Sequence, residues 1–98
     1  MKNYFVYILA SKTNGTLYIG VTGNLADRIE IHQKGLVSGF TKRYGVHKLV
    51  WFSVFNDIKE AILAEKRMKK WNREWKLNLI EKTNPNWDDL SQQIGAYH

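Results

Sequence analysis

The stretch that decides the fold is residues 4–20, YFVYILASKTNGTLYIG. Its first seven residues, 4–10, are aromatic, β-branched or aliphatic, which predicts a buried β-strand. Asn14-Gly15 is a strong signal for a tight turn, because both residues tolerate positive φ. Residues 16–20 then form the returning strand. The stretch is therefore predicted to fold as a β-hairpin.

The register of this hairpin decides whether Tyr7 and Tyr18 can act together. A two-residue loop would pair Thr13 with Thr16, whereas a four-residue loop would pair Ser11 with Thr16. Either even loop places the two tyrosines on the same face of the sheet, because side chains alternate with period two. An odd loop without a bulge would send them to opposite faces. The Asn-Gly signal favours the even case.

Beyond the hairpin, apolar periodicity predicts three helices and a third strand. In chain order these elements are a helix to about residue 34, a strand over 49–55, and helices over 57–71 and 73–82. Either Thr22 or Asn24 can cap the first helix. The chain is thus expected to form one domain over residues 1–98, with a core from about residue 4 to 82. In the C-terminal tail, residues 83–98, Trp87 and Leu90 can pack back on this core.

Composition limits the classes of function. The chain lacks cysteine, which excludes a disulfide framework and a thiolate zinc site. The longest apolar run, residues 4–10, is too short to span a bilayer and too rich in tyrosine for a signal peptide, so we expect an intracellular, cytoplasmic protein. Fifteen Lys and Arg against nine Asp and Glu give a net charge of +6. This excess favours a polyanion such as nucleic acid, although many small basic proteins bind none specifically.

Arg28 and His32 lie one turn apart on the first predicted helix, beside or within its apolar stripe. With Tyr7 and Tyr18 they form a group able to handle a phosphate and a proton. Each member also has a simpler interpretation. Tyrosines in strands usually pack in the core. A single arginine is usually at the surface, and a single histidine is more often satisfied or exposed than catalytic.

Glu65 is a second and independent candidate. On the helix over residues 57–71 it falls inside the arc that the apolar side chains define. A carboxylate in that position is costly to bury in ionised form without a cation or hydrogen-bond donors. An ion pair with Lys69 at i+4, or with Arg28 across the core, would satisfy it. A ligand-binding or catalytic role is the alternative.

A basic stripe borders the face that carries Glu65. Its members are Lys66, Lys69, Lys70 and Arg73. Such a stripe suits a phosphate backbone, but a solvated helix face explains the pattern equally well. Trp71 and Trp75, one turn apart, are attributed to packing rather than to base stacking.

Taken together, these residues resemble the signature of the GIY-YIG nuclease superfamily. The two motifs correspond to Phe5-Val6-Tyr7 and, after ten residues, Tyr18-Ile19-Gly20, with Phe5 in place of the first glycine. The small standalone branch of the superfamily is similar over further segments: Gly20-Val21-Thr22, Asn24-Leu25, Arg28, His32, Ala61, Glu65-Lys66, Lys69-Lys70-Trp71, Arg73, Lys76 and residues 84–90. The resemblance extends from residue 4 to about residue 90.

The resemblance implies an α+β fold in which helices flank a three-stranded antiparallel sheet. It also implies a metal-dependent phosphodiesterase in which Tyr7 is the general base and Tyr18 orients the water or binds phosphate. Arg28 would stabilise charge on the phosphoryl oxygens, and His32 would be a supporting proton-transfer or phosphate-binding group. Glu65 would hold a single divalent cation, Mg²⁺ or Mn²⁺.

The leading hypothesis is therefore an endonuclease that hydrolyses DNA phosphodiester bonds. The expected nucleic-acid contacts are Lys42, Arg43, Lys66, Lys69, Lys70 and Arg73. A non-catalytic nucleic-acid-binding module on the same fold is the first alternative. A structural or partner-binding domain, in which the basic face serves only solubility, is the second.

Overall fold

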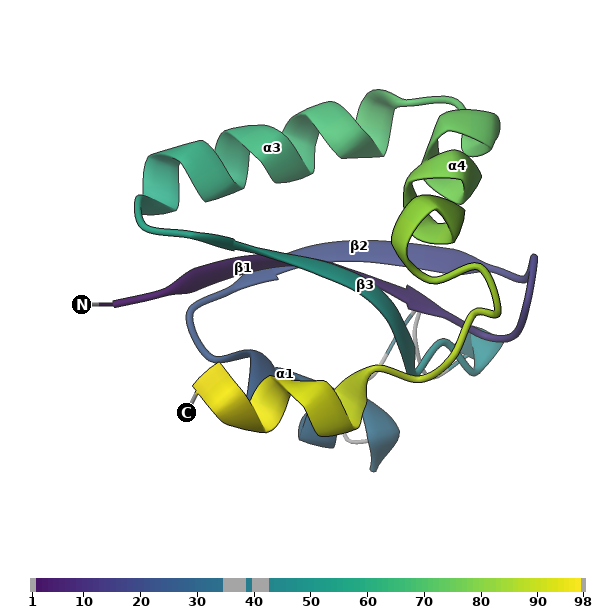
Figure 1. Cartoon of the computed structure of the whole chain (residues 1–98), viewed down its shortest axis with the longest axis horizontal. Coiled ribbons are helices and arrows are strands. Elements are labelled where there is room, and N and C mark those ends of the chain that lie inside the picture. The colour runs from purple at the N-terminus through teal and green to yellow at the C-terminus, as the bar shows by residue number, and fades with distance from the viewer. Residues whose placement is uncertain (1, 35–38, 40–42, 98) are drawn as a thin grey trace.

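A three-stranded sheet separates two sets of helices in the computed structural model, which describes residues 2–34, 39 and 43–97 (Figure 1). The strands are β1 (Tyr4–Ala10), β2 (Leu17–Thr22) and β3 (Lys48–Phe55), in the antiparallel order β2-β1-β3. The helices α3 (Ile58–Lys70) and α4 (Arg73–Thr83) cover one face, and α1 (Leu25–Gln33) and the 3₁₀ helix η1 (Ser91–Tyr97) cover the other. The expected α+β fold is confirmed.

Ser11 and Thr16 pair across the hairpin and close a loop of four residues, 12–15. The backbone N–H of Ser11 donates to the carbonyl of Thr16 at 3.0 Å, and the N–H of Thr16 donates back to the hydroxyl of Ser11 at 3.0 Å. Asn14 takes the left-handed conformation, with φ 57°. A Cβ on Gly15 would lie 2.8 Å from the Lys12 side chain and would also meet the hydroxyl of Ser11, so a larger residue would force both side chains to move. The Asn-Gly signal thus predicted the turn, and the longer of the two even loops is the one that forms.

The resulting register places the two tyrosines on one face of the sheet. Tyr7 lies opposite Gly20, and Leu9 lies opposite Tyr18. The prediction that both phenols share a face is confirmed. The returning strand ends at Thr22, two residues beyond the predicted Gly20.

The helices begin at capping side chains that the sequence supplies. The carboxamide of Asn24 accepts a hydrogen bond from the backbone of Asp27 and caps α1, while the hydroxyl of Thr22 accepts from Asn24 itself. Asn24 is therefore the cap, and Thr22 supports it. Asp57 and Asn72 cap α3 and α4 in the same way. None of these helices, nor any other in the described part of the chain, combines the length and hydropathy needed to cross a membrane.

The core has two layers, one on each face of the sheet. The layer under α3 and α4 contains Val6, Ile8, Ala10, Ile19, Val50, Ala61, Met68, Ile80 and Trp87. The layer over α1 contains Phe5, Tyr7, Leu9, Leu25, Ile29, Val46, Leu49 and Ile94. The tail after α4 contributes to both layers, because Trp87 is completely buried in one and Ile94 is buried in the other.

Candidate active site

Three ring side chains from three different elements meet on the α1 face of the sheet. The rings of Tyr7 on β1 and Tyr18 on β2 have centroids 6.4 Å apart. His32 on α1 lies 6.2 Å from the ring of Tyr7 and 5.7 Å from that of Tyr18. The predicted cooperation of the hairpin with the following helix therefore has a structural basis.

Gly20 makes room for the Tyr7 ring. The two residues are direct neighbours across β1 and β2. A Cβ added to Gly20 would lie 2.5 Å from Cζ of Tyr7 and would also collide with its hydroxyl. Any other residue at this position would displace the phenol. The glycine therefore sets the position of the Tyr7 hydroxyl, a role that strand alternation alone did not reveal.

The electrostatic surroundings of Tyr7 connect it to both Arg28 and Glu65. Burial raises the pKa of the Tyr7 phenol well above its ordinary value of 10, and Tyr18 and Glu65 raise that pKa further. The positive charge of Arg28 lowers the pKa of Tyr7, but not enough to offset the burial. The phenol is therefore protonated at neutral pH in the metal-free protein.

His32 is buried, with 5% of its surface exposed. Within the described part of the chain, neither ring nitrogen has a hydrogen-bond partner. Burial lowers the pKa of His32, and the charges of Arg28 and His47 lower it further, so the imidazole is neutral at pH 7. An unpartnered buried polar group costs free energy unless a ligand or water satisfies it.

Glu65 lies on α3, which covers the other face of the sheet. Its side chain is 14% exposed, and its carboxylate lies 3.5 Å from the ammonium of Lys69. Glu65 is therefore largely buried, as its place in the arc predicted, and of the two possible ion pairs it makes the one with Lys69. Its charge reaches Tyr7, since it contributes to the raised pKa of that phenol.

The two sides meet at β2, which is an edge strand. A hollow of about 290 Å³ there is lined by Leu17, Tyr18, Ile19, Lys69 and Lys76. Tyr18 thus borders both the ring cluster and the basic helices. Lys76 was absent from the predicted nucleic-acid contacts, although it lies one turn beyond Arg73 and continues the basic spacing of that segment.

A divalent cation at this site would have few protein ligands. The described residues contain no group of three or more His, Cys, Asp or Glu side chains arranged to hold a metal. One carboxylate with several waters is nevertheless an ordinary arrangement for Mg²⁺. The partly buried carboxylate of Glu65 fits this arrangement, provided that the exposed Lys69 ammonium moves aside.

The predicted nucleic-acid contacts are not all available to a ligand in the same way. Lys66 and Lys70 are exposed on α3. Arg73 instead donates from one guanidinium nitrogen to the carbonyls of Asn14 and Gly15, at 2.7 and 2.6 Å, and ties α4 to the hairpin loop.

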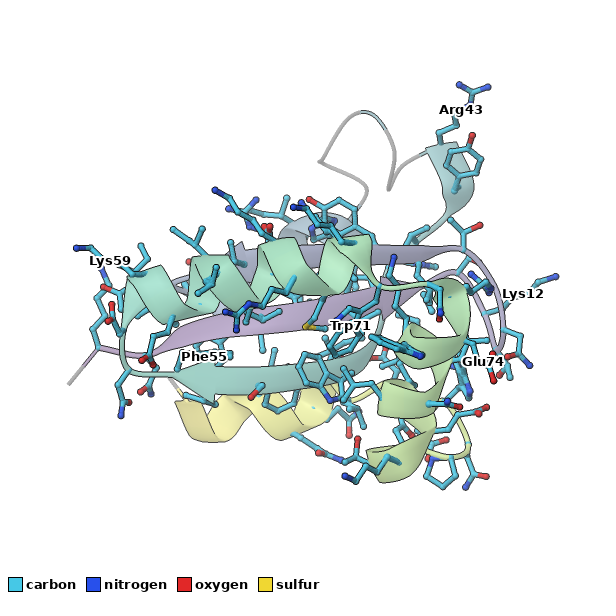
Figure 2. The ribbon with its side chains drawn as sticks, turned by 90° about the horizontal axis from the view of Figure 1, so that it is seen from above. Lys12, Arg43, Phe55, Lys59, Trp71 and Glu74 are labelled. Carbon is cyan, nitrogen blue, oxygen red and sulfur yellow. The ribbon has the colours of Figure 1, made fainter. Side chains whose placement is uncertain are left out.

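Two further predicted contacts come from the segment before β3. The guanidinium of Arg43 lies over the ring of Tyr44 at 5.6 Å. Figure 2 shows Arg43 projecting outward, well away from α3 and α4. The basic stripe on α3 therefore does not extend to Arg43. Lys42 lies outside the described residues.

Comparison with known proteins supports the resemblance. A family model described as the GIY-YIG catalytic domain matches residues 3–78. A UPF0213 protein of Clostridium perfringens is 37% identical over 90 residues, 92% of this chain and 96% of that protein. A UPF0213 protein of Staphylococcus haemolyticus is 36% identical over 83% of this chain and 98% of that protein.

A solved structure extends this similarity to the fold. The solution NMR structure of a UPF0213 protein from Bacillus halodurans has a TM-score of 0.56 and 28% sequence identity. The similarity covers 92% of this chain and 95% of that one. Since the family model spans both tyrosine motifs, α1 and all of α3, the chain belongs to the GIY-YIG family.

Proposed function

We propose that the protein is an endonuclease that hydrolyses DNA phosphodiester bonds with the help of Mg²⁺ or Mn²⁺. The observation that carries this proposal is the meeting of Tyr7, Tyr18 and His32 within 6.4 Å of one another, ring centre to ring centre. A purely structural cluster would satisfy its buried polar atoms, whereas both nitrogens of His32 lack a partner among the described residues.

In the proposed reaction, the oxygen of a water molecule forms a bond to phosphorus while the bond from phosphorus to the leaving oxygen breaks. The phenolate of Tyr7 accepts the water proton, and solvent protonates the leaving oxygen. Tyr18 orients the water or binds the phosphate. Arg28 stabilises the negative charge that grows on the phosphoryl oxygens. The neutral imidazole of His32 supports the reaction, because it can donate an N–H to a phosphate oxygen.

Because the pKa of Tyr7 is high, the site must supply positive charge before the phenol can act as a base. A phenol that is protonated at neutral pH is a weak base until positive charge is placed near it. Arg28 supplies part of that charge. A cation held by Glu65 would polarise the phosphate and make the phenol easier to deprotonate.

The non-catalytic binding module remains the second candidate, and two observations favour it. Burial keeps Tyr7 protonated, and Lys69 already neutralises Glu65. A protein with these features could retain a basic surface for nucleic acid without cutting it. The two candidates differ in whether DNA is cleaved when a divalent cation is present: the endonuclease cleaves it, and the binding module does not.

The test is to incubate the purified protein with linear, nicked and branched DNA, in Mg²⁺ and in EDTA. Cleavage is expected in Mg²⁺ only. Tyr7→Phe and Glu65→Gln should each lower the rate by about 10²- to 10⁴-fold, since each removes a group that acts on the reacting atoms. Arg28→Ala should lower it by about 10²- to 10³-fold.

Matched substitutions control for effects on folding. Tyr4→Phe changes a tyrosine on the same strand but packed on the α3 side, and Glu60→Gln changes an exposed glutamate on the same helix as Glu65. Both should leave the rate unchanged. Cleavage that survives Glu65→Gln would contradict the proposal. Salt-sensitive DNA binding without cleavage would establish the binding module instead.

A further inference from the structure

The most exposed large hydrophobic side chain among the described residues is Trp75 on α4, at 57%. Its neighbour Trp71, one turn earlier, packs against the core layer under α3 and α4. The expectation that this pair serves packing is therefore correct for Trp71 but does not account for Trp75. An exposed tryptophan of this size calls for another explanation.

The ring of Trp75 is held in place. Its centroid lies 6.0 Å from that of Trp71, with the planes inclined by 76°, so the two rings meet edge to face. Trp71 lies at the junction of α3 and α4, as Figure 2 shows. Trp75 thus contacts a ring that packs on the core, while more than half of its own surface remains in solvent.

The pair borders a hollow with the features of a small binding site. Its volume is about 290 Å³, and it is lined by Trp71, Trp75, Asn78, Leu79 and Lys82. The tryptophans and Leu79 provide an apolar wall. The amide of Asn78 can form hydrogen bonds with a heterocycle, and Lys82 can contact an anion.

The charged side chain that lines this hollow is Lys82, and it belongs to a pair of helices with a positive net charge. Residues 58–83, which include α3 and α4, carry eight Lys and Arg against four Glu, a net charge of +4. The exposed aromatic face of Trp75, with Lys82 beside it, fits a nucleobase joined to phosphate, because bases stack on aromatic rings while Lys and Arg contact the backbone.

We propose that the Trp75 hollow binds an unpaired nucleobase of a single-stranded nucleic acid. This inference rests on the proposed function, which supplies nucleic acid as the ligand. Lys76 follows Trp75 in sequence and lines the other hollow, the one that Tyr18 borders at strand β2. A strand held along Lys76 would run from the candidate active site toward Trp75. The proposed substrate is therefore DNA with a single-stranded segment next to the scissile bond.

The test measures binding rather than cleavage, in the Glu65→Gln protein, so that the substrate stays intact. A fluorescein-labelled oligo-dT of roughly 16 nucleotides and a blunt duplex of the same length are titrated by fluorescence anisotropy. Trp75→Ala should weaken binding of the single strand by about 5- to 150-fold, the range measured for the loss of one stacked base. Binding of the blunt duplex should not change.

Two controls separate stacking from other effects. Trp75→Phe keeps an aromatic face and should retain most of the affinity. Leu63→Ala removes another exposed hydrophobic side chain, on α3, and should have no effect. The salt dependence of Trp75→Ala should match that of the parent protein, because no phosphate contact is lost. Lys82→Gln, in contrast, removes one phosphate contact. It should therefore reduce the slope of log affinity against log salt concentration by about one.

Equal losses for single strand and duplex, or no loss at all, would overturn the inference. The inference would also be overturned if the parent protein were a dimer that Trp75→Ala dissociates without changing the affinity for the oligonucleotide. The hollow would then bind a second copy of the chain. Failure of the proposed function is distinguishable. In that case the wild-type protein would cleave nothing, while Trp75-dependent binding of the single strand could still be measured.

Discussion

The two faces of the sheet treat their buried polar side chains differently. Apart from Tyr7 and Trp87, whose rings also carry a polar atom, His32 and Asn84 are the buried polar side chains among the described residues, at 5% and 4% exposure. On the α3 side, the amide of Asn84 donates to the carbonyls of Val50 and Asp88 at 3.0 and 2.9 Å. Its oxygen accepts from the backbone of Asp88 at 3.0 Å. On the α1 side, His32 forms no such bond with any residue that the structure describes.

This difference indicates that one face of the sheet contributes mainly to the stability of the domain and the other mainly to its proposed function. A satisfied amide on one face joins β3 to the tail and strengthens the fold. An unsatisfied imidazole on the other face weakens it, and a bound ligand is what would offset that cost. The faces can therefore be tested independently.

The largest effect is expected at the position that gives the ring cluster its shape. Gly20→Ala would push the Tyr7 ring out of place, so cleavage should fall by at least about 100-fold. Overpacking should also cost about 1–3 kcal/mol of unfolding free energy. Kinetic assays and urea denaturation would measure the two effects.

Gly23→Ala is the matched control for Gly20→Ala. Its added Cβ would lie no closer than 3.7 Å to the nearest side chains, which is ordinary contact. It should therefore leave the rate almost unchanged. An active Gly20→Ala protein with wild-type stability would mean that the position of Tyr7 does not matter.

Asn84→Ala tests the satisfied side of the comparison. It removes three hydrogen bonds and leaves the buried carbonyl of Val50 without its partner, at an expected cost of about 2–4 kcal/mol in unfolding free energy. Asn78→Ala, an exposed asparagine on α4, should change stability by less than about 0.5 kcal/mol. Equal effects of the two substitutions in urea denaturation would remove the contrast between the faces.

His32→Phe tests the unsatisfied side and should leave stability at pH 7 unchanged or raise it by up to about 1 kcal/mol, because an apolar ring replaces an unpaired one. The charged groups facing His32 are Arg28 and His47, and burial lowers its pKa below the ordinary 6.5. As the pH falls below 6.5, the unfolded chain gains a proton that the folded chain does not, so wild-type stability should fall.

The slope of this fall cannot exceed about 1.4 kcal/mol per pH unit for one proton. Thermal denaturation from pH 8 to pH 5 would measure it, and His32→Phe should flatten the curve. A curve of the same shape in both proteins would show that His32 does not titrate on unfolding. Lower stability of the variant at pH 7 would show that the imidazole is satisfied in solution.

The smallest effect is expected at the ion pair between Lys69 and Glu65 on α3, because Glu65 is the proposed metal ligand. Lys69→Gln removes the ammonium that neutralises Glu65, so the protein without nucleic acid should bind Mg²⁺ more tightly. The pair is exposed on the lysine side, which limits the gain to about 5-fold. Isothermal titration calorimetry would measure this affinity, with Lys66→Gln as control. Unchanged affinity would argue against Glu65 as the metal ligand.

Local rules predicted most of the fold. Strand β1 matches its predicted limits, residues 4–10, and α3 and α4 begin and end within one residue of theirs. Period-two alternation, together with the even loop that Asn14-Gly15 favours, placed Tyr7 and Tyr18 on the same face. These features depend on short-range periodicity and capping, which a single sequence carries directly.

The rest depends on contacts between distant segments, which no local pattern encodes. Arg73 continued a basic stripe in the sequence, yet its guanidinium binds carbonyls of the hairpin loop. Trp75 shared helical spacing with Trp71, but only Trp71 packs against the core. The unpartnered nitrogens of His32 could not be anticipated either, since helical position predicted only that His32 would lie near the apolar stripe.

Because the tryptophans differ in exposure, their intrinsic fluorescence can report on different regions of the protein. The indole of Trp87 is fully enclosed and donates to the carboxylate of Glu81 at 3.0 Å, whereas Trp75 lies in solvent. Emission from an enclosed indole is shifted to shorter wavelengths than that of a hydrated one. A red shift from Trp87 would therefore follow unfolding, and quenching at Trp75 would follow ligand binding, both without an attached dye.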